Sequence, residues 1–274
     1  LFSDCGLTKQ DLANYYERVA ERMLPYLKER PLTLRCYPGG IEKDGFFNKN
    51  APDHFPDFIQ RIEVPAREQG REAVTMSSAD KPADLLYFAG QNTIELHAAL
   101  SAAGSLEQPD QIIFDFDPSD GDFDKVREAA LEFGTLLDSL EIQGFWKTTG
   151  SRGLHVHLPV QPENDFATIK DWAQQLARRL VEAKPDLTTL EQRMDQRDDK
   201  VFIDILRNAY GQTAVAPYSV RARPGAPVAT PVAFDEIKDS SFRPDDYTVK
   251  NIFRRLGQIE DPWDNFNHQH LDID

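Results

Sequence analysis

The order of strand-like and helix-like patterns between residues 111 and 206 constrains the fold of this chain more than any other feature. Apolar runs of strand length occur at four places, residues 111–116, 144–149, 154–160 and 200–206. Amphipathic patterns of helical period occupy residues 122–141 and 165–183. The order is therefore β-α-β-β-α-β, the split βαβ pattern of ferredoxin-like sheets. Right-handed crossovers in that pattern place the first strand in the middle of the sheet, between the third and the fourth.

Two aspartates stand where the first of these strands ends, in the stretch "QIIFDFDPSDGD". Side chains in a strand alternate between faces, so Asp115 and Asp117 share one face and Phe116 takes the other. Two carboxylates this close repel each other and raise one pKa unless a cation lies between them. A strand end followed by an Asp-rich turn explains the stretch equally well, because residues 118–121 are all turn formers. This stretch alone leaves both interpretations open.

The predicted topology brings further polar residues to the same face. Asp204 lies on the fourth strand, and His155 and His157 lie on the third, so both neighbours of the central strand carry polar side chains. A sheet core would not tolerate three carboxylates without a cation. Hard carboxylate oxygens favour Mg²⁺ or Mn²⁺, and two such ions about 4 Å apart can clamp the attacking and leaving oxygens of phosphoryl transfer. The spacing therefore favours a divalent-metal site.

The N-terminal part predicts a helix followed by a strand. Residues 7–30 have helical periodicity, with Thr8 as the N-cap, Asp11 completing an acidic capping box, and Pro31 ending the helix. The apolar stripe of this helix consists of Leu12, Tyr15, Tyr16, Val19, Met23 and Leu27. Residues 32–37 then form a short strand.

Length and cysteine content limit the class of protein. A chain of 274 residues, of which 40% are hydrophobic, can form one large domain or two small ones. Its two cysteines, Cys5 and Cys36, provide no disulfide framework and fit a reducing cytosol. We find no signal peptide and no apolar run long enough to span a membrane. The chain begins at Leu1 and not at a methionine, so we expect a domain cut from a longer protein.

The formal net charge of −15 argues against a nucleic-acid partner when it is taken over the whole chain. Contact with phosphates needs only a local basic patch, however. The segment 197–223 contains three aspartates and five basic residues, Arg197, Lys200, Arg207, Arg221 and Arg223. Much of the negative excess lies elsewhere, for example in the polar tail 259–274, which we expect to be irregular or a linker.

With these residues in place, the chain resembles the polymerase domain of bacterial DNA ligase D, in the archaeo-eukaryotic primase superfamily. The resemblance covers nearly the whole chain and rests on motifs in a fixed order. These are "RPLTLRCYPGG", "GFFNKN", "TIELH", "FDFDP", "TTGSRGLHVHLP" and "VFIDILRNAYGQTAVAPYSVRARPGAPVATPV". One departure is Thr149, where the family usually has serine, although the hydroxyl is kept.

Pattern and resemblance together imply an α/β (α+β) fold in a single primase-polymerase domain over 1–274. Its catalytic core, at about 106–235, contains the split β-α-β-β-α-β sheet, which is ferredoxin-like or RRM-like. An N-terminal α/β subdomain occupies about 1–105, and a C-terminal helix and tail occupy about 236–274.

The resemblance implies a template-dependent nucleotidyltransferase that fills gaps and adds nucleotides at broken DNA ends in non-homologous end joining. Such domains typically prefer ribonucleotides and Mn²⁺, so the implied cofactor is Mn²⁺ or Mg²⁺, as two ions. The implied partners are gapped or broken DNA with a 5′-phosphate, nucleoside triphosphates, Ku, and covalently linked ligase and phosphoesterase domains, with no membrane. The implied location is the bacterial cytoplasm, at the nucleoid when the protein is bound to DNA.

Matching motifs also imply roles for individual residues. Asp115, Asp117 and Asp204 match the metal ligands, and Asp204 is implied to help activate the primer 3′-hydroxyl. The implied nucleotide contacts are Thr149, Arg152, His155, His97, Arg197 and Arg221. The implied DNA contacts are Lys9, Arg35, Phe46, Phe47 and Lys49. Arginine forks, histidines and hydroxyls suit phosphate oxygens, exposed aromatics suit base stacking, and a lysine at a helix start suits a 5′-phosphate.

Plainer interpretations stand beside several of these roles. His157 shares the face of His155 and fits a structural histidine of the sheet. Phe46 and Phe47 fit ordinary core packing, and the basic residues among the DNA contacts fit plain surface charge. Two other functional classes also remain, a non-catalytic module that binds DNA ends and a cupin-like metal-dependent enzyme that uses the His-x-His strand on a small molecule. The cupin-like enzyme needs an all-β jelly roll, which the two amphipathic helices disfavour.

Overall fold

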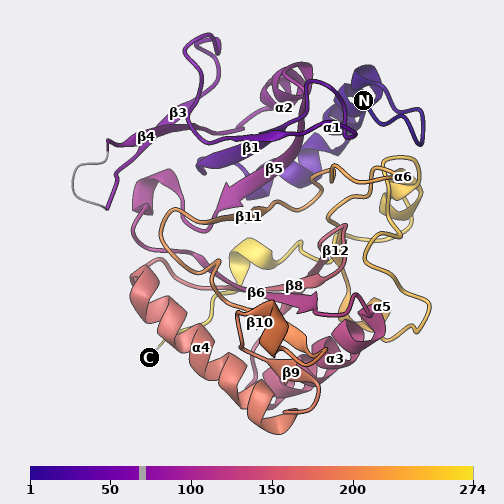
Figure 1. Cartoon of the computed structure of the whole chain (residues 1–274). Coiled ribbons are helices and arrows are strands. Elements are labelled where there is room, and N and C mark those ends of the chain that lie inside the picture. The colour runs from indigo at the N-terminus through magenta and orange to yellow at the C-terminus, as the bar shows by residue number, and fades with distance from the viewer. Residues whose placement is uncertain (68–71, 274) are drawn as a thin grey trace.

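The computed structural model describes residues 1–67 and 72–273, which form two sheets with helices on their outer sides (Figure 1). The upper sheet comes mainly from the N-terminal part of the chain, and the lower sheet comes from the middle. The inner faces of the two sheets are turned toward each other, so residues far apart in the sequence meet between them.

The lower sheet contains the split βαβ pattern. Its elements are β6 (Gln111–Pro118), α3 (Phe123–Ser139), β7 (Phe145–Thr148), β8 (Leu154–Pro159), α4 (Phe166–Ala183), β9 (Thr188–Thr189), β10 (Val201–Asp204) and β12 (Pro231–Val232). The strand order is β12-β7-β8-β6-β10-β9. The first strand of the pattern, β6, therefore lies between the third, β8, and the fourth, β10, which confirms the predicted topology.

The alternation of β6 sends its aromatic and acidic residues to opposite faces. The rings of Phe114 and Phe116 pack against Phe133 of α3, with centroids 4.9 and 5.5 Å apart. Both rings are fully buried in the core that the sheet forms with α3 and α4. Asp115 and Asp117 therefore point to the opposite face of the sheet. That face is turned toward the upper sheet (Figure 1).

The upper sheet has the strand order β11-β5-β1-β4-β3, and β2 pairs with β1. Its strands are β1 (Leu32–Cys36), β2 (Phe46–Asn48), β3 (Arg61–Val64), β4 (Val74–Ser77), β5 (Thr93–Ala99) and β11 (Thr213–Val215). The helices α1 (Lys9–Met23) and α2 (Pro82–Gly90) pack against each other over this sheet. The predicted apolar stripe of α1 is buried throughout, in one core cluster with Leu34 and Leu96 of the strands.

The helix α1 begins as predicted but ends earlier. Thr8 is the N-cap, and Thr8 and Asp11 form the reciprocal hydrogen bonds of a capping box. The α-helix ends at Met23 and continues as a 3-10 turn at Leu24–Tyr26. The prediction that Pro31 ends the helix is wrong because Pro25 acts first. Proline lacks the N–H donor, and its ring clashes with the carbonyl four residues earlier.

The C-terminal part contains only short helical elements. These are α5 (Phe234–Ile237), α6 (Ile252–Leu256) and a 3-10 turn at Phe266–His268. Earlier in the chain, 3-10 turns also lie at Ala103–Ser105 and Met194–Gln196. The tail is irregular as predicted, but it is not a loose linker, because Trp263 is buried and its Nε1 donates to the Trp146 carbonyl at 2.8 Å. Within the described residues, no helix is long and apolar enough to cross a membrane.

Candidate active site

A row of polar residues crosses the inner face of the lower sheet. Asp204 of β10 lies opposite Asp115 of β6, and Asp115 lies opposite His155 of β8. Lys147 of β7 lies opposite His155 on its other side. Asp117 follows Asp115 on the same face, nearer the end of the strand. The sheet thus brings the three predicted carboxylates and His155 to one surface.

Burial and mutual repulsion govern the charges of these carboxyl groups. Burial raises the pKa of Asp115 above its ordinary value, although the nearby Arg207 opposes the shift. Burial and the neighbouring Asp115 raise the pKa of Asp117 to about 7. Burial also raises the pKa of Asp204, whose Oδ1 accepts a hydrogen bond from the Leu206 N–H at 2.7 Å. All three groups therefore hold a proton more tightly than a free aspartate does, a state that a bound cation would reverse.

The carboxylates fit a divalent cation in their chemistry. Asp115 Oδ1 is buried and has no hydrogen-bond partner among the described residues, while Oδ2 lies 3.3 Å from His155 Nε2. A hard cation satisfies a buried acceptor of this kind. Over the residues that the structure describes, no three histidine, cysteine or acidic side chains form a complete ligand set.

A cavity of about 190 Å³ adjoins the carboxylates and takes its walls from both sheets. Asp115 and Asp117 line it, together with four arginines, Arg152, Arg207, Arg221 and Arg223. In a chain with a net charge of −15, this lining is a local excess of positive charge. Guanidinium groups bind phosphate oxygens bidentately. The cavity can therefore bind a polyphosphate beside a metal site.

The turn between β7 and β8 forms one wall of this cavity. The Thr149 hydroxyl donates to the Gly153 carbonyl at 3.0 Å and accepts from the Gly153 N–H at 3.2 Å. Gly150 has a φ of +61°, a left-handed conformation that favours glycine. A Cβ at Gly153 would collide with the Phe116 carbonyl oxygen, so only glycine lets the turn pack against β6. Thr149 and Arg152 thereby line the cavity beside the aspartates.

A buried glutamate on β5 orients two of the predicted nucleotide contacts. Glu95 Oε2 is 2.9 Å from His97 Nε2, and Oε1 is 3.4 Å from Arg221 Nε. Oε1 also accepts from the Ala222 N–H at 3.0 Å and lies 3.4 Å from Arg35 Nη1. Burial favours the protonated acid, but the His97 hydrogen bond and the Arg221 charge outweigh it and hold the pKa of Glu95 well below its ordinary value. Glu95 therefore fixes His97 and Arg221 at the cavity.

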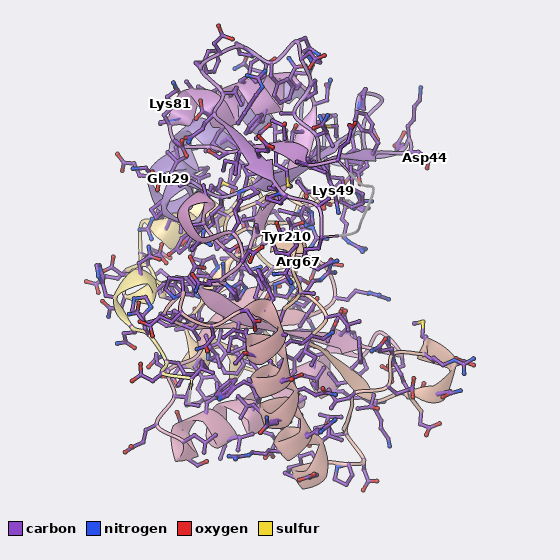
Figure 2. The ribbon with its side chains drawn as sticks, turned by 90° about the vertical axis from the view of Figure 1, so that its left-hand side faces the viewer. Glu29, Asp44, Lys49, Arg67, Lys81 and Tyr210 are labelled. Carbon is purple, nitrogen blue, oxygen red and sulfur yellow. The ribbon has the colours of Figure 1, made fainter. Side chains whose placement is uncertain are left out.

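Four of the predicted DNA contacts gather on β1, β2 and the residue after it. Phe46 and Phe47 are 53% and 57% exposed, so the core-packing interpretation is wrong for them. Arg35 pairs in register with Phe47, and its guanidinium lies 5.0 Å from that ring. Lys49 follows β2 and is exposed (Figure 2). The Phe47 ring is also 6.0 Å from the His97 ring, so this surface adjoins the cavity.

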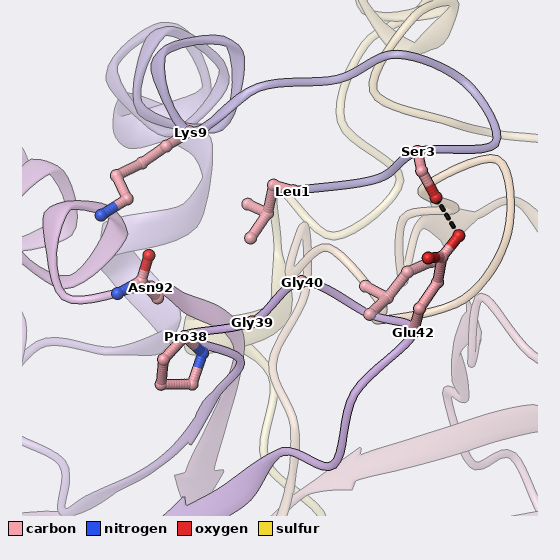
Figure 3. Close-up of a pocket in the computed structure, with 9 residues that line it drawn as sticks. Leu1, Ser3, Lys9, Pro38, Gly39, Gly40, Glu42 and Asn92 are labelled. Atoms are coloured by element: carbon pink, nitrogen blue, oxygen red, sulfur yellow. Dashed lines mark hydrogen bonds between the residues drawn. The ribbon is translucent and has the colours of Figure 1, made fainter.

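Lys9 lies elsewhere, at the start of α1. Its ammonium donates to the Gly90 carbonyl at 3.2 Å and lines a separate cavity of about 450 Å³ (Figure 3). The same cavity is lined by Glu42, which accepts a hydrogen bond from Ser3. The space is large enough for a phosphate group. The negative charge of Glu42 opposes the binding of such an anion, whereas the positive charge of Lys9 favours it.

Arg197 is not brought to the arginine-lined cavity. Its guanidinium lies 3.9 Å from the centre of the Phe202 ring and donates to the carbonyls of Glu191 and Gln192 at 2.9 and 2.7 Å. These contacts hold it against the loop before β10, apart from the other predicted nucleotide contacts.

Sequence reasoning assigned no role to two residues that line the cavity, Arg207 and Arg223. Both arginines lie in the basic segment 197–223, and the positive charge of that segment was the signal in the sequence for a phosphate-binding role. Arg207 belongs to a loop that Tyr210 ties to the upper sheet (Figure 2). The Tyr210 hydroxyl donates to the Pro65 carbonyl at 2.9 Å, and Arg67 lies 4.1 Å from the Tyr210 ring centre.

His157 has the structural environment that its plainer interpretation predicts. Its Nδ1 lies 2.8 Å from Gln111 Oε1, and its ring packs 4.8 Å from the ring of Trp263. It is buried away from the cavity lining.

Comparison with known proteins agrees with this geometry. The model of the LigD primase-polymerase domain matches residues 8–263. The bifunctional non-homologous end joining protein LigD of Bacillus subtilis is 31% identical over 97% of this chain and 42% of that protein. The multifunctional LigD of Pseudomonas aeruginosa is 33% identical over 93% of this chain and 30% of that protein. The polymerase domain of Mycobacterium tuberculosis ligase D, solved in complex with DNA, is 27% identical, with a TM-score of 0.90 over 99% of this chain and 96% of that one.

Fold and site together define a primase-type polymerase domain, a class of nucleotidyltransferases. The class has a metal-dependent site, in agreement with the carboxylates on β6 and β10. The chain belongs to the LigD primase-polymerase family, whose curated members named here are proteins of non-homologous end joining. It spans less than half the length of those two relatives. The cupin-like alternative is not supported, because the His-x-His strand lies in a sheet packed against α3 and α4 and not in a jelly roll.

Proposed function

We propose that this chain is a template-dependent nucleotidyltransferase that fills gaps and extends broken ends of DNA. The observation that carries the proposal is that Asp115 and Asp117 face a cavity lined by four arginines. Phosphoryl transfer depends on charge that neutralises the phosphates and on their correct placement, and this cavity offers both. The likeness to a polymerase domain solved with DNA supports a DNA partner.

The arginines and their neighbours bind the incoming nucleoside triphosphate. Arg152 and Arg221 donate paired hydrogen bonds to phosphate oxygens. Arg207 and Arg223 add positive charge that stabilises the bound phosphates. The N–H groups of His155 and His97 donate further hydrogen bonds, and the Thr149 hydroxyl turns from the Gly153 carbonyl to donate to a phosphate oxygen. Arg197, held against Phe202, takes no part from its present position.

The carboxylates of Asp115, Asp117 and Asp204 hold divalent ions, which we propose to be two Mn²⁺ or Mg²⁺ ions. When bound, these ions supply Lewis-acid charge to the reacting phosphate and hydroxyl oxygens. Asp204 Oδ2 accepts the proton of the primer 3′-hydroxyl, since its hydrogen bond to the Leu206 N–H uses only Oδ1. The hydroxyl oxygen then bonds to the α-phosphorus, the bond to the β-phosphate breaks, and pyrophosphate leaves.

The exposed surface of β2 binds the template. Phe46 and Phe47 stack on bases, while Arg35 and Lys49 contact phosphates. Lys9 binds the 5′-phosphate on the far side of a gap, where the free N–H groups of the α1 N-terminus also favour an anion.

The biological setting that we propose follows the relatives. The domain prefers ribonucleotides, works in non-homologous end joining in the bacterial cytoplasm at the nucleoid, and cooperates with Ku and with linked ligase and phosphoesterase domains. The support for this setting is the set of LigD proteins that the chain matches.

Primer extension on a gapped duplex tests the proposal. Labelled primer, ribo- or deoxynucleotides, and Mn²⁺ or Mg²⁺ should give products that match the template. Asp115→Asn should abolish extension, whereas Asp44→Asn, at an exposed aspartate away from the cavity, should retain it (Figure 2). DNA binding without extension would indicate a non-catalytic end-binding module. The absence of both binding and extension would refute the proposal.

A further inference from the structure

Lys147 is a lysine without solvent exposure, placed between the two sheets. Its Nζ donates to the Val215 carbonyl of β11 at 3.0 Å and lies 3.2 Å from His155 Nδ1. Burial and the nearby Arg221 lower the pKa of Lys147 to about 7. An apolar side chain of similar size would fill this position at a lower cost in free energy. The contribution of the amine therefore lies in the two groups that it contacts.

The position of the proton on His155 follows from its two neighbours. Each of its two ring nitrogens faces a different group. Nε2 faces Asp115 Oδ2 at 3.3 Å, while Nδ1 faces Lys147 Nζ, and a lysine ammonium can only donate a hydrogen bond. The proton is therefore on Nε2, and Nδ1 presents a lone pair. Lys147 is the donor that satisfies this lone pair.

His157, two residues along the same strand, has the opposite arrangement. Its Nδ1 faces the amide oxygen of Gln111 at 2.8 Å, so its proton is on Nδ1. The two buried rings lie 5.7 Å apart and share one face of β8, yet their neighbours select different tautomers. The position on β8 alone therefore does not determine the tautomer of His155. Its hydrogen-bond partner, Lys147 of β7, determines it.

We propose that Lys147 is a positioning residue that holds His155 in the Nε2–H tautomer and directs this N–H toward Asp115 and the cavity. The inference rests on the proposed function, in which Asp115 binds metal and His155 contacts the triphosphate. The second contact of Lys147 ties this arrangement to the upper sheet, because Val215 pairs in register with His97. One buried amine thus links the metal-binding row on the lower sheet to β11, which pairs with the strand that carries His97.

Nitrogen NMR of the metal-free chain, labelled with ¹⁵N in histidine, tests the proposal without any need for activity. Below the pKa of Lys147, which is about 7, wild-type His155 should show a proton-bearing Nε2 and a bare Nδ1, and His157 should show the reverse. In Lys147→Met the His155 nitrogens should shift toward a mixture of tautomers, while those of His157 stay in place. A wild-type His155 with its proton on Nδ1, or a tautomer unchanged in the variant, would overturn the proposal.

Nucleotide addition provides a second measurement. Lys147→Met should lower kcat/KM for the nucleotide by about 10–100-fold, the usual effect of removing a partner that orients a metal-site ligand. His155→Gln should lower it as well, and the double variant should be no worse than His155→Gln alone, because Lys147 acts through His155. Additive losses would overturn the positioning role. Lys28→Met, at an exposed lysine, is the matched control and should match wild type. Expected spectra from an inactive wild-type protein would refute the proposed function and leave the tautomer assignment intact.

Discussion

Asp117→Asn should make the metal-free protein more stable at mildly alkaline pH and remove its response to metal. The ordinary pKa of this carboxyl is 3.8, and burial and Asp115 raise it to about 7 in the folded protein. The folded state therefore binds the proton more tightly than the unfolded chain, and stability falls as the pH rises through the interval between these two values. Above about pH 7 the full cost of ionising Asp117 is present. Asparagine has nearly the same shape and cannot ionise, so it removes that cost.

The size of the effect follows from the same interval. The difference between 3.8 and about 7 is roughly three pH units, and each corresponds to about 1.4 kcal/mol, so the full cost of ionising Asp117 amounts to about 4 kcal/mol. The side chain of Asp117 is partly exposed, and water reduces part of this cost. We therefore expect the variant to gain about 2 kcal/mol above about pH 7, which raises the Tm of a domain of this size by roughly 4–8 °C.

Thermal unfolding followed by circular dichroism in buffers that contain a chelator measures this gain. The gain should be largest at about pH 8 and should shrink toward about pH 4. Excess Mn²⁺ should raise the Tm of the wild type, because an ion that binds only the folded state stabilises it, and should have little effect on Asp117→Asn. Asp44→Asn, at an exposed carboxylate, should match wild type in both respects.

Three results would refute this reasoning. Equal stability of variant and wild type at about pH 8 without metal would show that burial and Asp115 do not raise the pKa of Asp117. An equal Mn²⁺-dependent rise in Tm in both proteins would remove Asp117 from the metal ligands. Nucleotide addition by the variant at a rate close to wild type would likewise remove Asp117 from the metal ligands of the proposed mechanism.

Arg152→Ala should raise the KM for nucleotide more than it weakens DNA binding, because Arg152 lines the cavity; an equal loss in anisotropy titrations would place Arg152 in the DNA channel instead. Lys9→Ala should remove most of the preference for a gapped duplex with a 5′-phosphate, and added salt should shrink that preference. Identical wild-type affinities for duplexes with and without the phosphate would leave Lys9 as surface charge. Glu95→Gln should cost about 3 kcal/mol in urea unfolding and raise the KM for nucleotide, because His97 and Arg221 lose the carboxylate that orients them. A loss of stability without any change in KM would contradict that orienting role.

The sequence by itself determined the lower sheet and the direction of its acidic residues. The alternation of apolar runs and amphipathic helices is local information, and right-handed crossovers then fix the strand order of the split βαβ pattern. Because Phe114 and Phe116 had to enter the core, period-two alternation placed Asp115 and Asp117 on the other face. The cap at Thr8 followed from the same kind of local rule.

The tertiary structure decided which side chains complete the site. The cavity takes His97 from β5, the aspartates from β6, and arginines from loops later in the chain, and no local pattern relates positions so far apart. Both faces of β7 are buried, so periodicity gave no indication that Lys147 points at His155. Arg197 and Arg207 are alike in the sequence, yet one lies on Phe202 and the other reaches the cavity. A long charged side chain has many rotamers, and only the packing of distant segments around it selects one.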